Sequence, residues 1–316
     1  MTSTSRVPSH SCVALSALVL AGTMLAATQE PIPMTDRRFR AGVDVITVTA
    51  TVVDATGRLV TGLPRDAFQV LDDGQKQDVS LFTSDRVPVS VGLLLDTSDS
   101  MRGQRIIDAR AAVGRFLGDL LHADDEFFVM SFSHKWTLLA PWTAGAGEAA
   151  TALAAADATG GTAVYDAVLA ALPMMEDRSR QRAALVVISD GADTASDASV
   201  RDVRSALYRS AAFVYAIAID PPVTRAINTR VNVDTLRDIT DYGGGRTLVV
   251  HDTSELAEAT ESIATELNGQ YLLGYDAPHR RDATFHTIRV TVNVPQLKVR
   301  ARRGYVAADA PHSKKD

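Results

Sequence analysis

The stretch Val87-Pro-Val-Ser-Val-Gly-Leu-Leu-Leu-Asp-Thr-Ser-Asp-Ser-Met101 decides the fold of the chain. Its first part is an almost unbroken apolar run, which is typical of a β-strand that is buried on both faces. The run ends in Asp96, Ser98 and Ser100, which present oxygen atoms on alternate residues just before an expected helix. Such a turn can bind a small hard cation. It can equally cap the helix, because Asp and Ser side chains accept hydrogen bonds from free backbone amides.

The centre of the chain alternates apolar strands with amphipathic helices. Helical stripes fall within 106–120, 163–175, 200–207 and 255–267, and Gly243-Gly-Gly245 is predicted to be a turn after a further helix. This alternation predicts an α/β fold with a doubly wound, mostly parallel, Rossmann-like sheet. Residues 136–139 follow the second strand closely enough to form an antiparallel edge. The expected strands are 89–96, 126–133, 183–189, 213–219 and 246–251.

The two flanks of this centre are predicted to be β-rich. Residues 46–52 alternate strictly between apolar and polar, and 68–71 with 79–82 are expected to form a hairpin around the turn 72–75. Strands are also expected at 271–275, 286–294 and 297–306, with Ile288, Val290, Val292 and Val294 facing inward. We expect segments 39–86 and 269–308 to pair as a small β-sandwich beside a central domain at 87–268.

The N-terminus has the pattern of a signal peptide at residues 1–28, with an apolar core from Cys12 to Ala27 behind Arg6. An uncleaved anchor is the alternative. Cleavage would leave no membrane span and no cysteine, so we expect an exported bacterial protein, periplasmic or secreted. Residues 309–316 are expected to be a disordered tail. With 316 residues, 46% of them hydrophobic, and a net charge of −6, the chain can build a large core and has no nucleic-acid footprint.

Polar residues follow two further expected elements of the centre. Asp190 ends the strand at 183–189, and Thr162 follows two glycines just before the helix at 163–175. Since ligand sites of open α/β sheets lie outside the carboxyl ends of the strands, we expect these side chains to converge with Asp96. An all-oxygen set suits Mg²⁺, Mn²⁺ or Ca²⁺. Asp166 and Asp193 lie nearby, and a helix-dipole charge and a loop position are their simpler roles.

Asp96-x-Ser98-x-Ser100, the Gly-Gly-Thr162 turn and Ser189-Asp190-Gly191 together resemble the metal-ion-dependent adhesion site of von Willebrand factor type A domains. The resemblance implies that Ser98, Ser100 and Thr162 ligate the ion directly. It also implies that Asp96 and Asp190 hold the ion mainly through water. The three remaining acidic residues, Asp99, Asp166 and Asp193, are candidates to support these ligands from outside.

Asp99 stands where many members of this family have glycine, and we expect it to point outward. The flanking segments Phe39-Arg-Ala-Gly-Val-Asp-Val, Phe68-Gln-Val-Leu-Asp-Asp-Gly and Arg302-Arg-Gly-Tyr305 resemble the exported acidobacterial type A-related family. That family implies little about biological role, whereas the resemblance to the adhesion site implies a non-enzymatic module that binds a protein ligand through Mg²⁺ (or Mn²⁺ or Ca²⁺). An acidic side chain of the partner would complete the metal's shell.

Two other functions stay open at this point. The protein could be a scaffold or assembly component whose metal site is not essential, with the β-sandwich making the contacts. It could also be a metal-dependent phosphohydrolase that uses Asp96 as its nucleophile, since carboxylates accept phosphoryl groups in some ATPases. Against the second function, serines stand where such an enzyme would need another carboxylate.

Overall fold

The computed structural model describes residues 44–143, 145–190, 193–219, 233–277 and 283–307. The expected signal peptide (1–28), the expected tail (309–316) and Gly191 lie outside the described residues.

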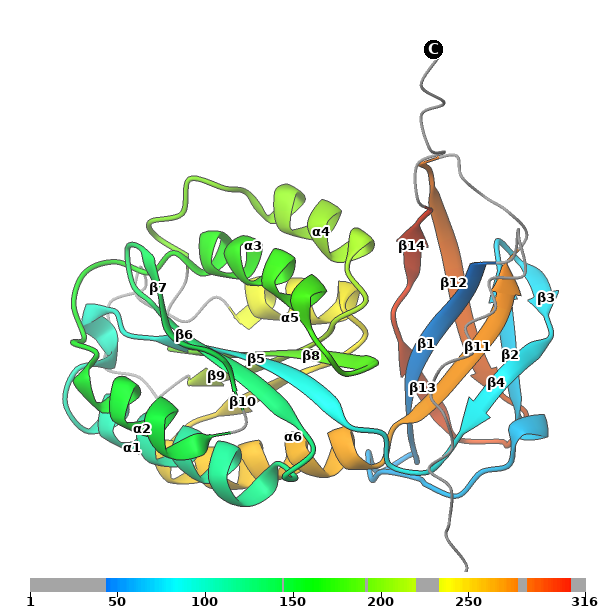
Figure 1. The fold of residues 1–316 in the computed structure, drawn as a ribbon, viewed down its shortest axis with the longest axis horizontal. Helices are drawn as coiled ribbons and strands as arrows, with labels where there is room; N and C mark the ends of the chain where they lie inside the picture. Colours follow the sequence, from blue (N-terminus) through cyan, green and yellow to red (C-terminus); the bar gives the residue numbers. More distant parts are fainter. Residues whose placement is uncertain (1–43, 144, 191–192, 220–232, 278–282, 308–316) are drawn as a thin grey trace, which may run out of the picture. The chain divides into compact units, whose positions relative to one another are not determined.

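The central sheet has six strands in the order β10-β9-β8-β5-β6-β7 (Figure 1). All neighbouring pairs are parallel except β6 with β7, which lies antiparallel at one edge. The doubly wound, mostly parallel sheet and its antiparallel edge are therefore confirmed. The bounds are β5 (Val89–Asp96), β6 (Glu126–Phe132), β7 (Trp136–Thr143), β8 (Arg182–Ser189), β9 (Phe213–Ile219) and β10 (Thr247–Val250).

Helices cover both faces of this sheet (Figure 1). One face carries α1 (Gln104–Arg115), a π-helical turn (Phe116–Leu120), α2 (Ala146–Ala155) and α6 (Leu256–Asn268). The other face carries α3 (Val164–Met174), α4 (Val200–Arg209) and α5 (Val233–Tyr242). Of the helices in the described part of the chain, none combines the length and the apolar character that a membrane span needs.

The flanking segments form two four-stranded sheets with a shared apolar core, as the sequence predicts. One sheet has the order β13-β1-β11-β4 and the other β14-β12-β2-β3. The strands nearest the N-terminus are β1 (Asp44–Val53), β2 (Phe68–Asp72), β3 (Gln75–Gln77) and β4 (Val79–Thr83). Those after the central domain are β11 (Tyr271–Ala277), β12 (Phe285–Val292), β13 (Lys298–Ala301) and β14 (Gly304–Val306).

Three expectations about these strands were wrong. The hairpin partner of β2 is the short β3, while β4 crosses to the other sheet and pairs with β11. The expected strand 297–306 is two strands, because the chain leaves β13 in one sheet and enters β14 in the other. Val294 is exposed, since β12 already ends at Val292. In the first two cases a change of sheet decides the outcome, and local apolar alternation does not encode it.

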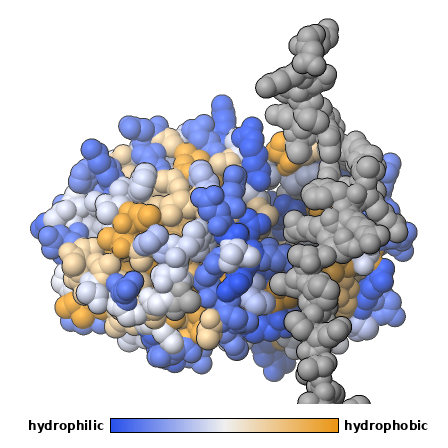
Figure 2. Space-filling view, in the orientation of Figure 1, coloured by the Kyte–Doolittle hydropathy of each residue, from blue (hydrophilic) through white to orange (hydrophobic). Residues whose placement is uncertain are grey.

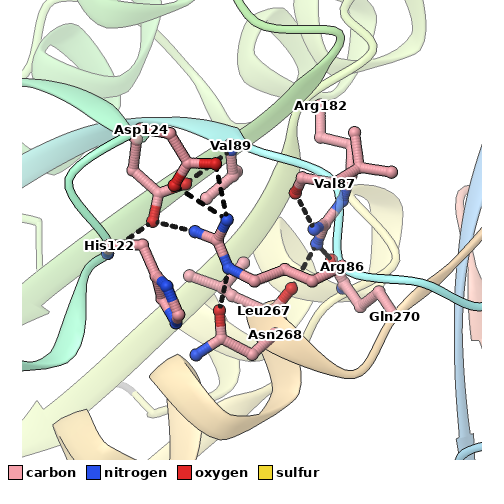
Figure 3. A network of polar contacts seen from close by, with 10 residues as sticks. Arg86, Val87, Val89, His122, Asp124, Arg182, Leu267, Asn268 and Gln270 are labelled. Carbon is pink, nitrogen blue, oxygen red and sulfur yellow. Dashed lines mark hydrogen bonds and ion pairs between the residues drawn. The ribbon is translucent and has the colours of Figure 1, made fainter. Parts of the chain in front are cut away.

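A polar network joins the entry and exit of the central domain (Figure 3). Arg86, just before β5, places Nη2 2.5 Å from the Asp125 carboxylate. Arg182, at the start of β8, donates to the Leu267 carbonyl at 2.6 Å and to the Gln270 side chain. Because Leu267 ends the buried face of α6 and Gln270 precedes β11, Arg182 connects the sheet with the chain that leaves the domain.

Large apolar side chains are concentrated in the three buried clusters. On the face shown in Figure 2, hydrophilic residues dominate and hydrophobic residues form small separate patches. Single exposed residues such as Ile107 and Trp136 are normal for a protein surface.

Candidate metal centre

Two buried carboxylates lie at the carboxyl ends of neighbouring strands. Asp96 is the last residue of β5, and Asp190 follows the end of β8. The two strands pair in parallel, with Leu95 opposite Ile188, so both side chains reach the same edge of the sheet. Neither residue is exposed to solvent. Two anionic groups without access to bulk water need hydrogen-bond donors or a cation nearby.

Serine hydroxyls and amides meet these carboxylates. The Ser98 amide donates to Asp96 Oδ1 (2.8 Å), and the Ser189 hydroxyl donates to Asp96 Oδ2 (2.6 Å). The Ser98 and Ser100 hydroxyls lie 2.9 Å apart, and the Ser100 hydroxyl donates to Asp190 Oδ1 at 2.5 Å. The structure thus brings Asp96, Ser98, Ser100 and Asp190 into one continuous polar cluster.

The ionisation of Asp96 reflects its burial. Burial raises the pKa of the Asp96 carboxyl from 3.8 to about 6, against the hydrogen bonds from Ser189 and Ser98, which lower it. The neighbouring charge of Asp190 raises the same pKa further. A bound cation would oppose this effect, because it favours the ionised carboxylate.

The loop that carries Thr162 is hydrogen-bonded to the Asp96–Ser100 turn. The Asp99 amide donates to the Gly160 carbonyl (2.9 Å), and Thr162 is buried. Gly160 has φ +85°, and a Cβ there would lie 2.7 Å from Nδ1 of His134. Gly160 therefore lets this loop take a left-handed backbone conformation and pack closely against His134.

Asp99 takes no part in the cluster. Its side chain is 60% exposed and pairs at 3.0 Å with Arg102, which is equally exposed. Asp99 therefore points outward as expected, and its negative charge lies on the surface beside the candidate site, where it can act on an approaching partner.

Asp166 and Asp193 tie the loop after Asp190 to the start of α3. Asp166 accepts hydrogen bonds from the amides of Asp197 and Ala198, each at 3.0 Å. Asp193 accepts from the Tyr165 amide at 3.0 Å. The hydrogen bonds of both carboxylates connect loops, and none of those within the described residues reaches the serine–aspartate cluster. Both residues thus hold the backbone around Thr162.

Arg105 is a site residue that the sequence analysis did not identify. It lies in the first turn of α1 and places Nη1 2.6 Å from Asp190 Oδ2, while also donating to the Ser100 carbonyl (2.9 Å). Helical side chains lean toward the N-terminus of their helix, so a basic residue in this turn reaches back to the preceding loop. This rule could have pointed to Arg105 in the sequence.

A second acidic group lies in the β-sandwich. Ligand atoms of Asp72, Asp73 and His286 come within 4.8 Å of one another. The Tyr275 and Tyr305 hydroxyls donate to Asp72 Oδ2 at 3.0 and 3.1 Å, and His286 Nδ1 lies 2.9 Å from Asp73 Oδ2. These hydrogen bonds already explain how the carboxylates are accommodated at this place.

The donor chemistry of the cluster around Asp96 fits a hard divalent cation. Every candidate ligand offers oxygen, three of them as neutral hydroxyls, which favours Mg²⁺, Mn²⁺ or Ca²⁺ over zinc or copper. The two buried carboxylates bring more negative charge than Arg105 alone compensates.

Comparisons with known proteins agree with this fold. Residues 91–192, which include all five candidate ligands, match the family model of the von Willebrand factor type A domain. Inter-alpha-trypsin inhibitor heavy chain H4 of the pig, Sus scrofa, is 31% identical over 121 residues. The aligned part is 35% of this chain and only 13% of that relative.

Solved structures extend the likeness. A von Willebrand factor type A protein from Catenulispora acidiphila is 13% identical, with a TM-score of 0.51 over 86% of this chain and 75% of that one. BatB from Bacteroides thetaiotaomicron is 21% identical, with a TM-score of 0.47 over 57% of this chain and 97% of that one. At 13% identity, the likeness to the Catenulispora acidiphila protein concerns the fold alone. Residues 91–192 are thus similar to the von Willebrand factor type A domain, and the central sheet has the fold of such domains.

Proposed function

We propose that this protein is a divalent-cation-dependent protein-binding module. Ser98, Ser100 and Thr162 would ligate Mg²⁺ (or Mn²⁺ or Ca²⁺), and Asp96 and Asp190 would hold it through water. The observation that carries this proposal is the cluster of serine hydroxyls around two buried carboxylates at the ends of β5 and β8. The ion would supply positive charge and orientation, and an acidic side chain of the partner would complete its shell.

Binding without a reaction is the mode we propose. Phosphoryl transfer to Asp96 would need an accessible carboxylate oxygen in line with the phosphorus. Both oxygens of Asp96 accept hydrogen bonds and the residue is fully buried, which speaks against that role. The apolar N-terminal run supports export of this module to the periplasm or beyond. We propose that the central domain spans 87–268 and that the two β-segments of the sandwich span 39–86 and 269–308.

One observation favours a second candidate function. The Arg105 guanidinium already pairs with Asp190, so this carboxylate is compensated without any ion. In that case the metal site would be dispensable, and the protein would act as a scaffold through other surfaces.

The two candidates differ in their response to metal. We expect Mg²⁺ at about 100 times its Kd to stabilise the purified protein by about 2.7 kcal/mol over chelator. For a domain of this size that raises Tm by about 5–10 °C. Ser98→Ala should lose the shift, while the neighbouring Asp99→Ala should keep it. If the folded wild type shows no Tm shift with Mg²⁺, the metal-dependent function is wrong and the scaffold function remains.

A further inference from the structure

A cavity of about 710 Å³ lies between the end of α5 and the open side of the β-sandwich. Its walls come from β2, β12, β13, the crossing to β14 and the turn between α5 and β10. None of the candidate metal ligands lines it. The volume falls within the range of small-molecule sites, which is roughly 300–1,000 Å³.

The lining is strongly cationic. Arg289, Arg300, Arg302 and Arg303 all line the cavity, and among its described lining residues Asp241 is the only acidic one. Arginine is the side chain best suited to bind planar or tetrahedral oxyanions, since its guanidinium presents a rigid fork of donors. Four such groups around one cavity therefore point to an anionic occupant.

The carboxylates nearby compensate only part of this charge. Glu266, at the end of α6, accepts from Arg300 Nη2 at 2.6 Å and also pairs with Arg246 at 2.6 Å. The pair of Arg303 with Asp241 is 3.2 Å long and largely exposed, so it contributes little. Among the described residues, Glu266 and Asp241 thus pair with Arg246, Arg300 and Arg303, and the Asp73 carboxylate accepts hydrogen bonds from Thr287 at the cavity wall.

Donor groups around the cavity also exceed the acceptors. Nη1 of Arg300 and Nε of Arg302 are buried and have no hydrogen-bond partner among the described residues. Arg289 is exposed on β12, and its side chain makes no hydrogen bond or ion pair with the described residues. Buried donors that lack acceptors are costly, and an oxyanion would supply the acceptors.

The fold holds these arginines in place without help from a ligand. Gly244, in the turn after α5, has φ +78°, and a Cβ there would lie 2.6 Å from the carbonyl carbon of Ala301 and from the Arg302 amide. The turn therefore packs backbone against backbone on the end of β13. Arg302 is fixed further by its hydrogen bond to the Thr47 carbonyl (2.8 Å) and by the Tyr305 ring beneath it.

We propose that this arginine-lined cavity binds a small multivalent anion that carries phosphoryl or several carboxylate groups. The site is separate from the candidate metal centre and goes beyond the metal-dependent function. Its occupant would bridge the central domain and the β-sandwich, because the arginines belong to β12, β13 and the following crossing while Asp241 and Gly244 belong to the α5 side.

Isothermal titration of the full chain tests this proposal. Pyrophosphate and citrate are titrated in chelator and at constant ionic strength, with hexaglutamate as a peptide comparison. The variants are Arg289→Gln and the double variant Arg289→Gln/Arg303→Gln, whose side chains are exposed and whose loss leaves the fold intact. Arg58→Gln, an exposed arginine outside the cavity, is the matched control.

We expect saturable binding of pyrophosphate, of citrate or of both, weakened about tenfold for each guanidinium removed and unchanged in Arg58→Gln. Binding of pyrophosphate alone identifies a phosphoryl ligand, and binding of citrate alone a polycarboxylate. The proposal is overturned if neither anion binds, if only hexaglutamate binds, or if the variants bind as tightly as the wild type.

Discussion

Replacing Arg105 with methionine tests how the positive charge of this side chain affects the stability and the Mg²⁺ affinity of the candidate metal centre. Methionine keeps most of the length of the side chain but removes the guanidinium that lies 2.6 Å from Asp190 Oδ2. Asp190 is fully buried, so the change leaves an uncompensated carboxylate next to Asp96. We therefore expect the variant to be less stable without metal and to bind Mg²⁺ more tightly.

The size of both effects follows from the burial of the pair. Removing one partner of a fully buried ion pair costs about 3–5 kcal/mol. Because Arg105 is 23% exposed, we expect Arg105→Met to lower the unfolding free energy in chelator by about 2–3 kcal/mol. This corresponds to a fall in Tm of about 4–12 °C in chelator. If Mg²⁺ recovers most of that free energy, its affinity rises by about 10- to 100-fold.

Thermal melts in chelator and in Mg²⁺, combined with calorimetric titration of Mg²⁺, measure both quantities. Arg102→Met is the matched control, because Arg102 lies just before α1 and pairs only with the exposed Asp99 and a loop carbonyl. The reasoning is refuted if Arg105→Met is as stable as the wild type in chelator, or if its Mg²⁺ affinity is equal or lower.

Three further predictions test the surroundings of the site. Because the pKa of the Asp96 carboxyl is raised to about 6, the folded chain binds a proton at this carboxyl more tightly than the unfolded chain does. The metal-free protein should therefore become more stable as pH falls from 6 to 4, and the Mg²⁺-induced Tm shift should shrink between pH 7.5 and 5. An equal Tm shift at both pH values would contradict this prediction. Arg182→Met should lower the unfolding free energy by about 3 kcal/mol in urea, against no change for the exposed Arg58→Met. Gly244→Ala should cost about 2 kcal/mol more than Gly57→Ala, which has the same positive φ but open space around it; equal costs would mean that the contact of Gly244 with β13 is not tight.

The strands of the central sheet could be predicted closely from the sequence. The bounds of β5 and β9 coincide with the expected 89–96 and 213–219, because strands buried on both faces are unbroken apolar runs. The convergence of Asp96 and Asp190 followed from the rule that the carboxyl ends of parallel strands share an edge.

The pairing of the sandwich strands could not be predicted in the same way. β1 pairs with β11 across more than two hundred residues, and β4 joins the same sheet beside β11. No local pattern distinguishes this arrangement from the simple hairpin that was expected. Arg105 was missed for a related reason, since its role depends on where the first turn of α1 places a long side chain.

The central claim is that Ser98, Ser100 and Thr162 hold a divalent cation beside Asp96 and Asp190. A crystal structure of the protein grown with Mn²⁺, with anomalous diffraction measured, tests it most directly. The account predicts one strong anomalous peak among these five side chains, with Arg105 moved away from Asp190 or retained behind it. No peak there, or a peak only at Asp72, Asp73 and His286, would contradict it.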